Sequence, residues 1–426
     1  MASDATGCRH GEAKGLCLCR GEVLAALARV LDYAPSPLVS HHGRVAVAAA
    51  RLAARLEGVD EQTVFHAALI HDIGAPRDGT DPPHCWNLEE QANHPLLRSH
   101  PLVGAQMAAD VAGLLGIAPI ILDHHEWVNG HGYPRGKGGE EISTAAQVLR
   151  FADTCDMVLR EQTGPELVAF VHAVESRARS QVAPCIAHAG IEVLGEADFY
   201  SQLFNPQDVE LLVKGTTRRL DADDLADTEA EVTGLLELFG HLTDAHPSDK
   251  IGHSRRVAAL AVLVAMAMGL EEDETRRLKW AALVHDIGLV SVPKDLLDKP
   301  GLLAPEELAQ VRRHTGIMEE FLRPIHGLED VTRIAAAHGE AYDGSGYPNG
   351  LSGREIPLGA RVLAVCDTFD ALTSRRPYRE ARDTSLAIDI LVKGSTSVFD
   401  PDVVDAAIPV FLIACRREEV EAAIGG

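Results

Sequence analysis

The sequence is poor in aromatic side chains and has no long apolar run. Aromatic residues make up only 4% of the 426 residues, whereas Ala, Leu and Val are abundant. This composition favours helices packed through small and aliphatic side chains over a β-sandwich, so we expect an all-α protein. No run of about 18 apolar residues and no charged-then-apolar leader is present. We therefore expect neither a membrane span nor a signal peptide, and a cytoplasmic location.

Basic residues are scarce relative to acidic ones. The chain has 39 Lys and Arg against 63 Asp and Glu, which gives a formal net charge of −24. A protein that binds nucleic-acid polymers needs a basic stripe to neutralise phosphates, and this sequence offers none. Bound divalent cations would offset part of the negative charge.

The eight cysteines are scattered, and only an N-terminal group stands apart. Cys8, His10, Cys17 and Cys19 could together form a small zinc site. Their spacing matches no familiar zinc finger and the segment is rich in glycine, so a disordered leader is the alternative.

The most informative feature is an internal repeat of metal-ligand residues. Five residues recur with a constant displacement of 214 positions (285 − 71): His71, Asp72, His100, His124 and Asp153 recur as His285, Asp286, His314, His338 and Asp367. Core periodicity alone would preserve only the residue class, whereas this register preserves imidazoles, carboxylates and a Gly-Tyr-Pro tripeptide. The chain therefore carries two copies of one metal-binding domain.

The length agrees with two domains, because 426 residues exceed what a single core usually supports. We expect a leader at residues 1–30, a first domain at 31–215, an acidic linking helix at 216–245 and a second domain at 246–426. The stretch from Gly74 to Pro95 is rich in Pro, Gly, Asp and Asn and predicts a loop across the metal-bearing end of the first domain.

The spacing predicts a dinuclear centre in each copy. An adjacent His-Asp pair at the end of an apolar helix offers one nitrogen and a carboxylate that can bridge two cations, so Asp72 and Asp286 are the expected catalytic bridges. In the first copy His41 and His125 add two further imidazoles. Imidazole with carboxylate and without thiolate favours iron, manganese or zinc over calcium or magnesium. We prefer iron or manganese, with two ions per intact site.

The second copy also resembles a known family. The segments His285-Asp286-Ile-Gly, His338-Gly-Glu-Ala-Tyr-Asp-Gly-Ser-Gly346-Tyr347-Pro and Asp367-Thr-Phe-Asp370 look like those of the HD-GYP phosphodiesterases, a branch of the HD phosphohydrolases. The resemblance covers nearly all of the second copy and extends over residues 41–156 of the first. It implies a helical domain with two or three metals, usually iron or manganese, that hydrolyses cyclic dinucleotides, above all cyclic di-GMP.

Carried over residue by residue, the resemblance assigns a role to each matching position. The implied metal ligands of the second copy are His253, His285, Asp286, His314, His338 and Asp367, with Asp249 as a ligand for a third metal. The implied substrate contacts are Tyr133 in the first copy and Gly346, Tyr347, Asp370, Arg376 and Arg379 in the second.

Departures from the family pattern fall in complementary places. Gly339 stands where the family has the second His of a pair, which removes a nitrogen from the second copy. The first copy keeps both histidines but has Asn129 in place of the Asp of its Gly-Tyr-Pro motif, and Gln162 and Pro165 in place of an Arg-Pro-Tyr-Arg segment. Its fuller ligand set favours the first copy as the hydrolytic centre, whereas the arginines favour the second. The sequence leaves both open.

Two other functions remain possible at this level. Degenerate sites could bind a nucleotide or signalling partner proteins without turnover. Both copies also lack the Lys that commonly follows His-Asp-Ile-Gly and have Ala75 and Leu289 there, which leaves room for another phosphate ester or for a di-iron oxygenase.

Overall fold

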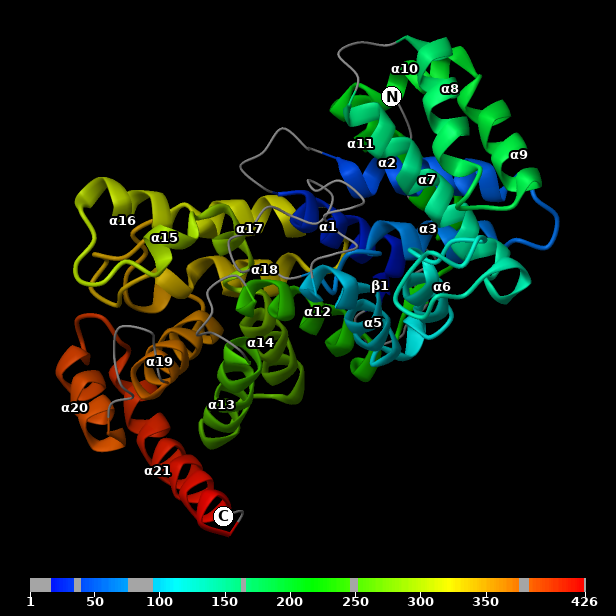
Figure 1. The fold of residues 1–426 in the computed structure, drawn as a ribbon. Helices are drawn as coiled ribbons and strands as arrows, with labels where there is room; N and C mark the ends of the chain where they lie inside the picture. Colours follow the sequence, from blue (N-terminus) through cyan, green and yellow to red (C-terminus); the bar gives the residue numbers. More distant parts are fainter. Residues whose placement is uncertain are drawn as a thin grey trace. The chain divides into compact units, whose positions relative to one another are not determined.

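The structure is a computed structural model, and it describes residues 17–33, 40–75, 95–161, 166–245, 252–374 and 383–424. Figure 1 shows that these residues are almost entirely helical, which confirms the predicted all-α class. The chain divides into two compact units. Apart from short segments, one unit ends at Gly234 and the other begins at Leu235.

The helices of the first unit enclose the first set of predicted ligands. Its elements are α1 (Arg20–Asp32), α2 (His41–Ala53), α3 (Glu61–Leu69), α5 (Pro95–Ala109), η2 (Ala112–Leu114), α6 (Ala118–Asp123), η3 (Gly139–Glu141), α7 (Thr144–Arg160), α8 (Leu167–Ala178), α9 (Pro184–Leu194), α10 (Ala197–Leu203) and α11 (Pro206–Leu220). Helix α12 (Glu229–Asp244) contains the point of division between the units.

The second unit repeats this order with different additions. Its elements are α13 (His253–Ala267), α14 (Glu272–Val284), η4 (Ile287–Ser291), α15 (Lys294–Leu297), α16 (Pro305–Arg312), α17 (His314–Leu322), α18 (Glu329–Ala336), η5 (Ala337–Gly339), η6 (Gly353–Glu355), α19 (Leu358–Thr373), α20 (Thr384–Gly394) and α21 (Pro401–Ile424).

Helix α2 is the centre of the first unit. It packs against α3 and α7, and every one of its residues except Arg51 is buried. Small side chains from Ala46 to Ala50 allow the neighbouring helices to approach closely, so this helix holds its first residue, His41, deep in the core. Helix α13 has the same place in the second unit, where it packs against α14 and α19.

The expected leader extends too far along the chain. Residues 20–32 form α1, which buries Leu24, Leu27 and Leu31 against α2 and α3. The apolar side chains of this segment recur at helical spacing, so their burial stabilises the helix as part of the first unit. Residues 1–16, including Cys8 and His10, lie outside the described residues.

The expected linking helix over 216–245 is interrupted. Helix α11 ends at Leu220, a short strand β2 (Leu225–Ala226) follows, and α12 begins only at Glu229. Strand β2 pairs antiparallel with β1 (Leu18–Cys19). The break lies at Asp221, whose carboxylate bonds His66 Nε2 at 2.9 Å, because short acidic side chains compete with the helical hydrogen bonds.

The glycine of each His-Asp-Ile-Gly segment allows two backbones to meet. A Cβ at Gly74 would lie 2.4 Å from the carbonyl oxygen of His100, and a Cβ at Gly288 would lie 1.9 Å from that of His314. Any side chain at either position would therefore push the third histidine away from the His-Asp pair. Among the described residues, no helix combines the length and apolarity needed to cross a membrane.

Candidate metal centres

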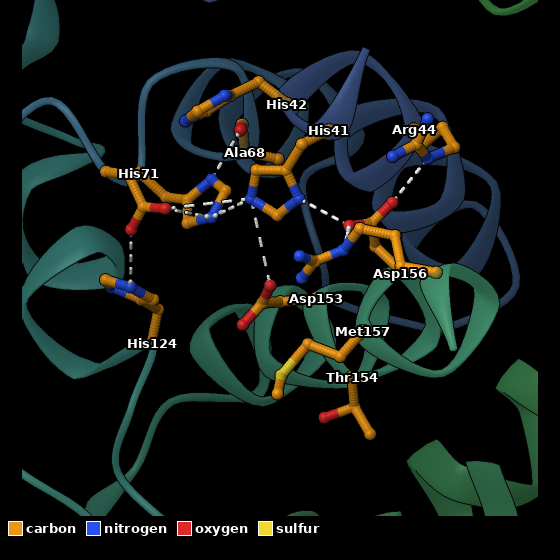
Figure 2. Close-up of polar contacts among 12 residues, drawn as sticks. His41, His42, Arg44, Ala68, His71, His124, Asp153, Thr154, Asp156 and Met157 are labelled. Atoms are coloured by element: carbon orange, nitrogen blue, oxygen red, sulfur yellow. Dashed lines mark hydrogen bonds and ion pairs between the residues drawn. The ribbon is translucent and has the colours of Figure 1, made fainter. Parts of the chain in front are cut away.

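The structure brings the predicted ligands of the first copy to one place. They are His41 at the start of α2, His71 and Asp72 directly after α3, His100 in α5, His124 and His125 after α6, and Asp153 in α7. No residue of this set is more than 5% exposed. Figure 2 shows part of this centre, with the ring of His41 between Asp156 on one side and His71 and Asp153 on the other.

Asp72 lies between two groups of histidines. Its Oδ2 is 3.7 Å from His41 Nε2 and 3.5 Å from His71 Nε2. Its Oδ1 is 3.1 Å from His100 Nε2 and 3.6 Å from His124 Nε2. One carboxylate thus presents one oxygen to each group, which is the geometry expected of a bridge between two cations. We call the His41 side position A and the His100 side position B.

The second unit has the same plan. Asp286 Oδ2 lies 3.8 Å from His253 Nε2 and 3.5 Å from His285 Nε2 at position A. Its Oδ1 lies 3.6 Å from His314 Nε2 and 4.0 Å from His338 Nε2 at position B. Asp367 Oδ1 approaches His253 Nε2 to 3.3 Å at position A.

Backbone carbonyls orient most of these rings. In six histidines, Nδ1 lies within hydrogen-bond distance of the carbonyl oxygen three residues earlier, at 2.5–2.9 Å: His71, His100, His124, His285, His314 and His338. A carbonyl only accepts, so Nδ1 must carry the proton and Nε2 the lone pair. This is the usual arrangement by which the backbone prepares a histidine for metal binding.

A carboxylate does the same for the first histidine of each copy. His41 Nδ1 donates to Asp156 at 2.7 Å, and Asp156 also pairs with Arg44. His253 Nδ1 donates to Asp370 at 2.8 Å, and Arg256 donates to the same carboxylate at 2.7 Å. Asp370, expected to contact substrate, is thus a buried partner of a ligand histidine.

Ring nitrogens face each other across both positions of the first centre and across position B of the second. The Nε2 atoms are 3.3 Å apart in His41 and His71 and 3.2 Å apart in His100 and His124. The corresponding distance between His314 and His338 is 3.4 Å. Two lone pairs at this separation repel unless a proton or a metal ion lies between them. Metal–nitrogen bonds of about 2.0–2.1 Å at a tetrahedral angle would place such nitrogens about 3.3–3.4 Å apart, so the residues fit a bound metal.

Burial sets the charge state of the rings. It lowers the pKa of His71 to about 3, and it also lowers the pKa of His124, His285 and His338. These imidazoles are neutral near neutral pH, which is the form that binds metals. His41 differs. Burial alone would lower its pKa, but the charge of Asp156 and hydrogen bonds to carboxylates outweigh burial and raise it to about 9.

The carboxylates remain ionised. Burial would raise the pKa of Asp72, but His71 and the hydrogen-bonded histidines outweigh it and hold this pKa well below its usual value. The pKa of Asp153 is lowered in the same way, against burial, by Arg150 and the neighbouring histidines. His253 lowers the pKa of Asp367. His71, His124, His285 and His338 therefore offer neutral nitrogens, and the carboxylates offer negatively charged oxygens.

His125 is oriented differently from the other predicted ligands. Arg150, which is fully buried, donates from Nη1 to His125 Nδ1 at 2.7 Å and to Asp153 Oδ2 at 3.1 Å. In the neutral ring this places the proton on Nε2. The ring of His125 also stacks on Tyr133, with centroids 4.6 Å apart. His125 thus lies in the position B group, but its Nδ1 accepts a hydrogen bond from the guanidinium of Arg150.

Tyr347 occupies the space of the missing histidine in the second unit. A Cβ at Gly339 would lie 2.5 Å from the ring of Tyr347. The ring lies edge-on to His314, with centroids 6.3 Å apart, and burial raises the pKa of its hydroxyl to about 12. The loss of a ligand and the position of the tyrosine are therefore coupled.

The two Gly-Tyr-Pro loops are held by a glutamate that follows the histidines. Glu126 accepts from the backbone N–H of Arg135 at 2.6 Å and of Lys137 at 2.8 Å. Glu340 accepts from the matching Asn349 and Leu351 at 2.7 and 3.1 Å. Both Tyr-Pro peptide bonds are cis.

The glycine of this tripeptide, Gly346, packs against its own loop, since a Cβ there would meet the backbone nitrogen of Ala341 at 2.1 Å. Substitution of Gly346 would thus displace the loop. Gly346 was expected to contact substrate. The close packing of its loop gives a structural reason for glycine at this position, which the sequence did not indicate.

Several predicted residues lie outside the described part of the chain, namely Asp249, Arg376 and Arg379. Other residues of the centres were missed. Asp156 recurs as Asp370 at the same displacement of 214, so the repeat could have identified it. The repeat could not have identified Arg150 or His42, because their counterparts are Ala364 and Ser254. Among the described residues, the candidate metal-ligand groups include no cysteine, and Cys19 donates from Sγ to the carbonyl of Asp221.

Comparisons with known proteins agree with this architecture. Residues 38–158 and residues 237–403 each match the HD domain family. Over 312 residues the chain is 31% identical to 3′3′-cGAMP-specific phosphodiesterase 3 of Vibrio cholerae, which covers 72% of this chain and 65% of that protein. It is 43% identical over 155 residues to the cyclic di-GMP phosphodiesterase response regulator RpfG of Xanthomonas campestris, covering 36% and 41% of the two chains.

A solved structure has the same fold. A crystal structure of a cyclic GMP-AMP-specific phosphodiesterase of V. cholerae superposes with a TM-score of 0.64 at 23% identity, covering 93% of this chain and 97% of the other. The chain belongs to the HD-GYP family and contains two HD domains.

Proposed function

We propose that this protein is a metal-dependent phosphodiesterase that hydrolyses cyclic dinucleotides. The observation that carries the proposal is the bridging carboxylate, Asp72 or Asp286, with neutral, pre-oriented imidazoles on both sides. Two bound iron or manganese ions would supply activated water near neutral pH and stabilise the charge that builds on the phosphate. The distances between facing nitrogens support two ions in the first centre and one at position B of the second.

The second centre is the better candidate for hydrolysis. The side chain of Asp367 is 30% exposed, whereas that of its counterpart Asp153 is 7% exposed and pairs with Arg150. Within the described part of the chain, position B of the second centre has three candidate ligands, Asp286, His314 and His338. Catalytic sites commonly keep such an incomplete ligand set so that water and substrate can enter, whereas structural sites are closed.

Residues of the second unit would have different roles around the phosphate. Asp286 would hold both ions at a fixed separation. Tyr347 and the exposed Arg312, whose guanidinium lies 5.0 Å from the Tyr347 ring centroid, border the centre and would orient the phosphate and exclude water. Asp370 would act through His253 by keeping its Nε2 directed at position A.

Relatives indicate two substrates to compare. The match to the 3′3′-cGAMP-specific enzyme extends over 72% of this chain, which requires residues from both units. The match to the cyclic di-GMP enzyme covers 36%, no more than one unit. We therefore place 3′3′-cGAMP first and cyclic di-GMP second.

The test uses full-length protein purified without oxygen and loaded with Fe²⁺ or Mn²⁺. Each cyclic dinucleotide is incubated with the protein, and linear products are separated by chromatography. We expect linear dinucleotide from at least one substrate and loss of product after chelation. Metal-loaded protein that binds a dinucleotide without cleaving it would replace this proposal with a non-catalytic receptor.

A further inference from the structure

We propose that His42 is an additional metal ligand of the first centre, at position A. This inference rests on the metal centre of the proposed function. It gives that position three imidazoles, from His41, His42 and His71, together with the bridging carboxylate of Asp72. Neither the internal repeat nor the family resemblance assigns a role to this residue.

His42 lies within the ligand group. It is 1% exposed, and its ring centroid is 4.8 Å from that of His41 and 4.9 Å from that of His71. One ligand atom from each of His41, His42, His71 and Asp72 lies within 4.8 Å of the others. Figure 2 shows His42 beside His41 and above His71, on the side of the group away from Asp153.

The partly buried carboxylate of Asp32 orients the ring. Asp32 Oδ1 accepts from His42 Nδ1 at 2.7 Å and from the backbone N–H of His42 at 3.1 Å. The proton therefore lies on Nδ1 and the lone pair on Nε2. This is the arrangement that Asp156 imposes on His41 in the same centre, and carboxylate–histidine pairs of this kind commonly support metal ligands.

In the second unit, the carboxylate that corresponds to Asp32 makes its hydrogen bonds without a histidine. There Asp244 takes the place of Asp32 and accepts from the backbone N–H of Ser254 at 3.2 Å and from its hydroxyl at 2.8 Å. A serine is enough to satisfy this contact at the start of α13. Among the described residues, the candidate ligand group at that position consists of His253, His285 and Asp367. The hydrogen bonds to this carboxylate therefore do not require the imidazole of His42 in the first unit.

The extra nitrogen predicts a difference in metal preference. Imidazole-rich sites suit iron, cobalt and zinc, whereas manganese is better suited to carboxylate and water ligands. The first centre should therefore hold Co²⁺ or Fe²⁺ more tightly than the second centre does. It should also discriminate more strongly against Mn²⁺.

The experiment measures metal binding by the first centre alone. Full-length protein carrying His285→Ala and Asp286→Asn is made metal-free, and Co²⁺ and Mn²⁺ affinities are determined by competition with a coloured chelator. His42→Ser, which introduces the residue of the second unit, should weaken Co²⁺ binding by about 100-fold or more and change the visible absorption of bound Co²⁺. Asp32→Asn should weaken binding about tenfold, in the range of outer partners of metal ligands.

The outcomes separate the two proposals. If the parent protein binds no Co²⁺ at the first centre, the metal centre itself is wrong. If the parent binds Co²⁺ and His42→Ser leaves both affinity and absorption unchanged, only the role of His42 is overturned. Urea unfolding of the metal-free proteins controls for folding. Should the serine variant fail to fold, His42→Gln keeps an amide donor near Asp32, and an unchanged Co²⁺ affinity and spectrum there would overturn the inference equally.

Discussion

Each of the two centres has its own candidate bridging carboxylate, and the centres differ in the residues that surround it. In the first, Arg150 pairs with Asp153, His125 stacks on Tyr133, and His42 joins position A. The second has Ala364, Gly339 and Ser254 at these places. The same backbone frame thus carries a closed, ligand-rich centre and an open one with fewer ligands. A larger set of ligands does not by itself indicate the site of hydrolysis, because substrate must also reach the metals.

The largest expected effect comes from removing each bridge in turn. Asp286→Asn should lower turnover at least about a hundredfold, because the variant loses the charge that holds both ions where phosphate charge develops. The matched Asp72→Asn should lower it less than tenfold. Turnover is measured under saturating metal, with helicity as the folding control. The opposite ranking would assign hydrolysis to the first centre.

The next effect concerns the carboxylate behind His253. Asp370→Ala should weaken metal binding by about 10–100-fold, because His253 loses the acceptor that fixes its ring. Turnover at low metal should fall, and added metal should restore most of it. Asp156→Ala is the matched change in the first unit and should alter metal content without altering turnover. A loss of turnover that metal does not restore would make Asp370 a substrate contact.

A third change tests the coupling of Gly339 and Tyr347. Gly339→His alone should destabilise the protein by about 1–3 kcal/mol, the usual cost of overpacking, because the new side chain overlaps the Tyr347 ring. Gly339→His with Tyr347→Ala should recover stability and bind metal more tightly at position B. Chemical unfolding and elemental analysis provide the two measurements. Tighter metal binding by the single variant would show that the tyrosine moves freely.

The smallest expected effect is at the border of the second centre. Arg312→Ala should raise KM several-fold with little change in kcat, because the guanidinium orients the phosphate before reaction. Arg98→Ala, its counterpart near Tyr133 in the first unit, is the matched control and should leave KM unchanged. Equal effects of the two changes would mean that both centres receive substrate.

The helical class and the two-domain organisation could be predicted from the sequence, because both depend on residue identity at fixed spacing. The repeat indicated two copies of one domain, and the scarcity of aromatic residues indicated helices. The bridging roles of Asp72 and Asp286 stay a prediction. The family resemblance indicated the fold, which the comparisons support. The boundaries were harder. The break at Asp221 accompanies a hydrogen bond to His66, which is 155 positions away, and local periodicity does not report such a contact.

Residue identity and spacing alone indicate that this chain has two centres of histidine and aspartate, because imidazoles and carboxylates are metal ligands in any fold. Which nitrogen lone pairs face each centre, in contrast, depends on the folded arrangement of the helices. His42 is a candidate ligand because Asp32 accepts a hydrogen bond from its Nδ1. His125 differs from the other histidines because Arg150 of α7 donates a hydrogen bond to its Nδ1. Ring orientation depends on hydrogen-bond partners that folding brings together, and no spacing along the chain encodes them.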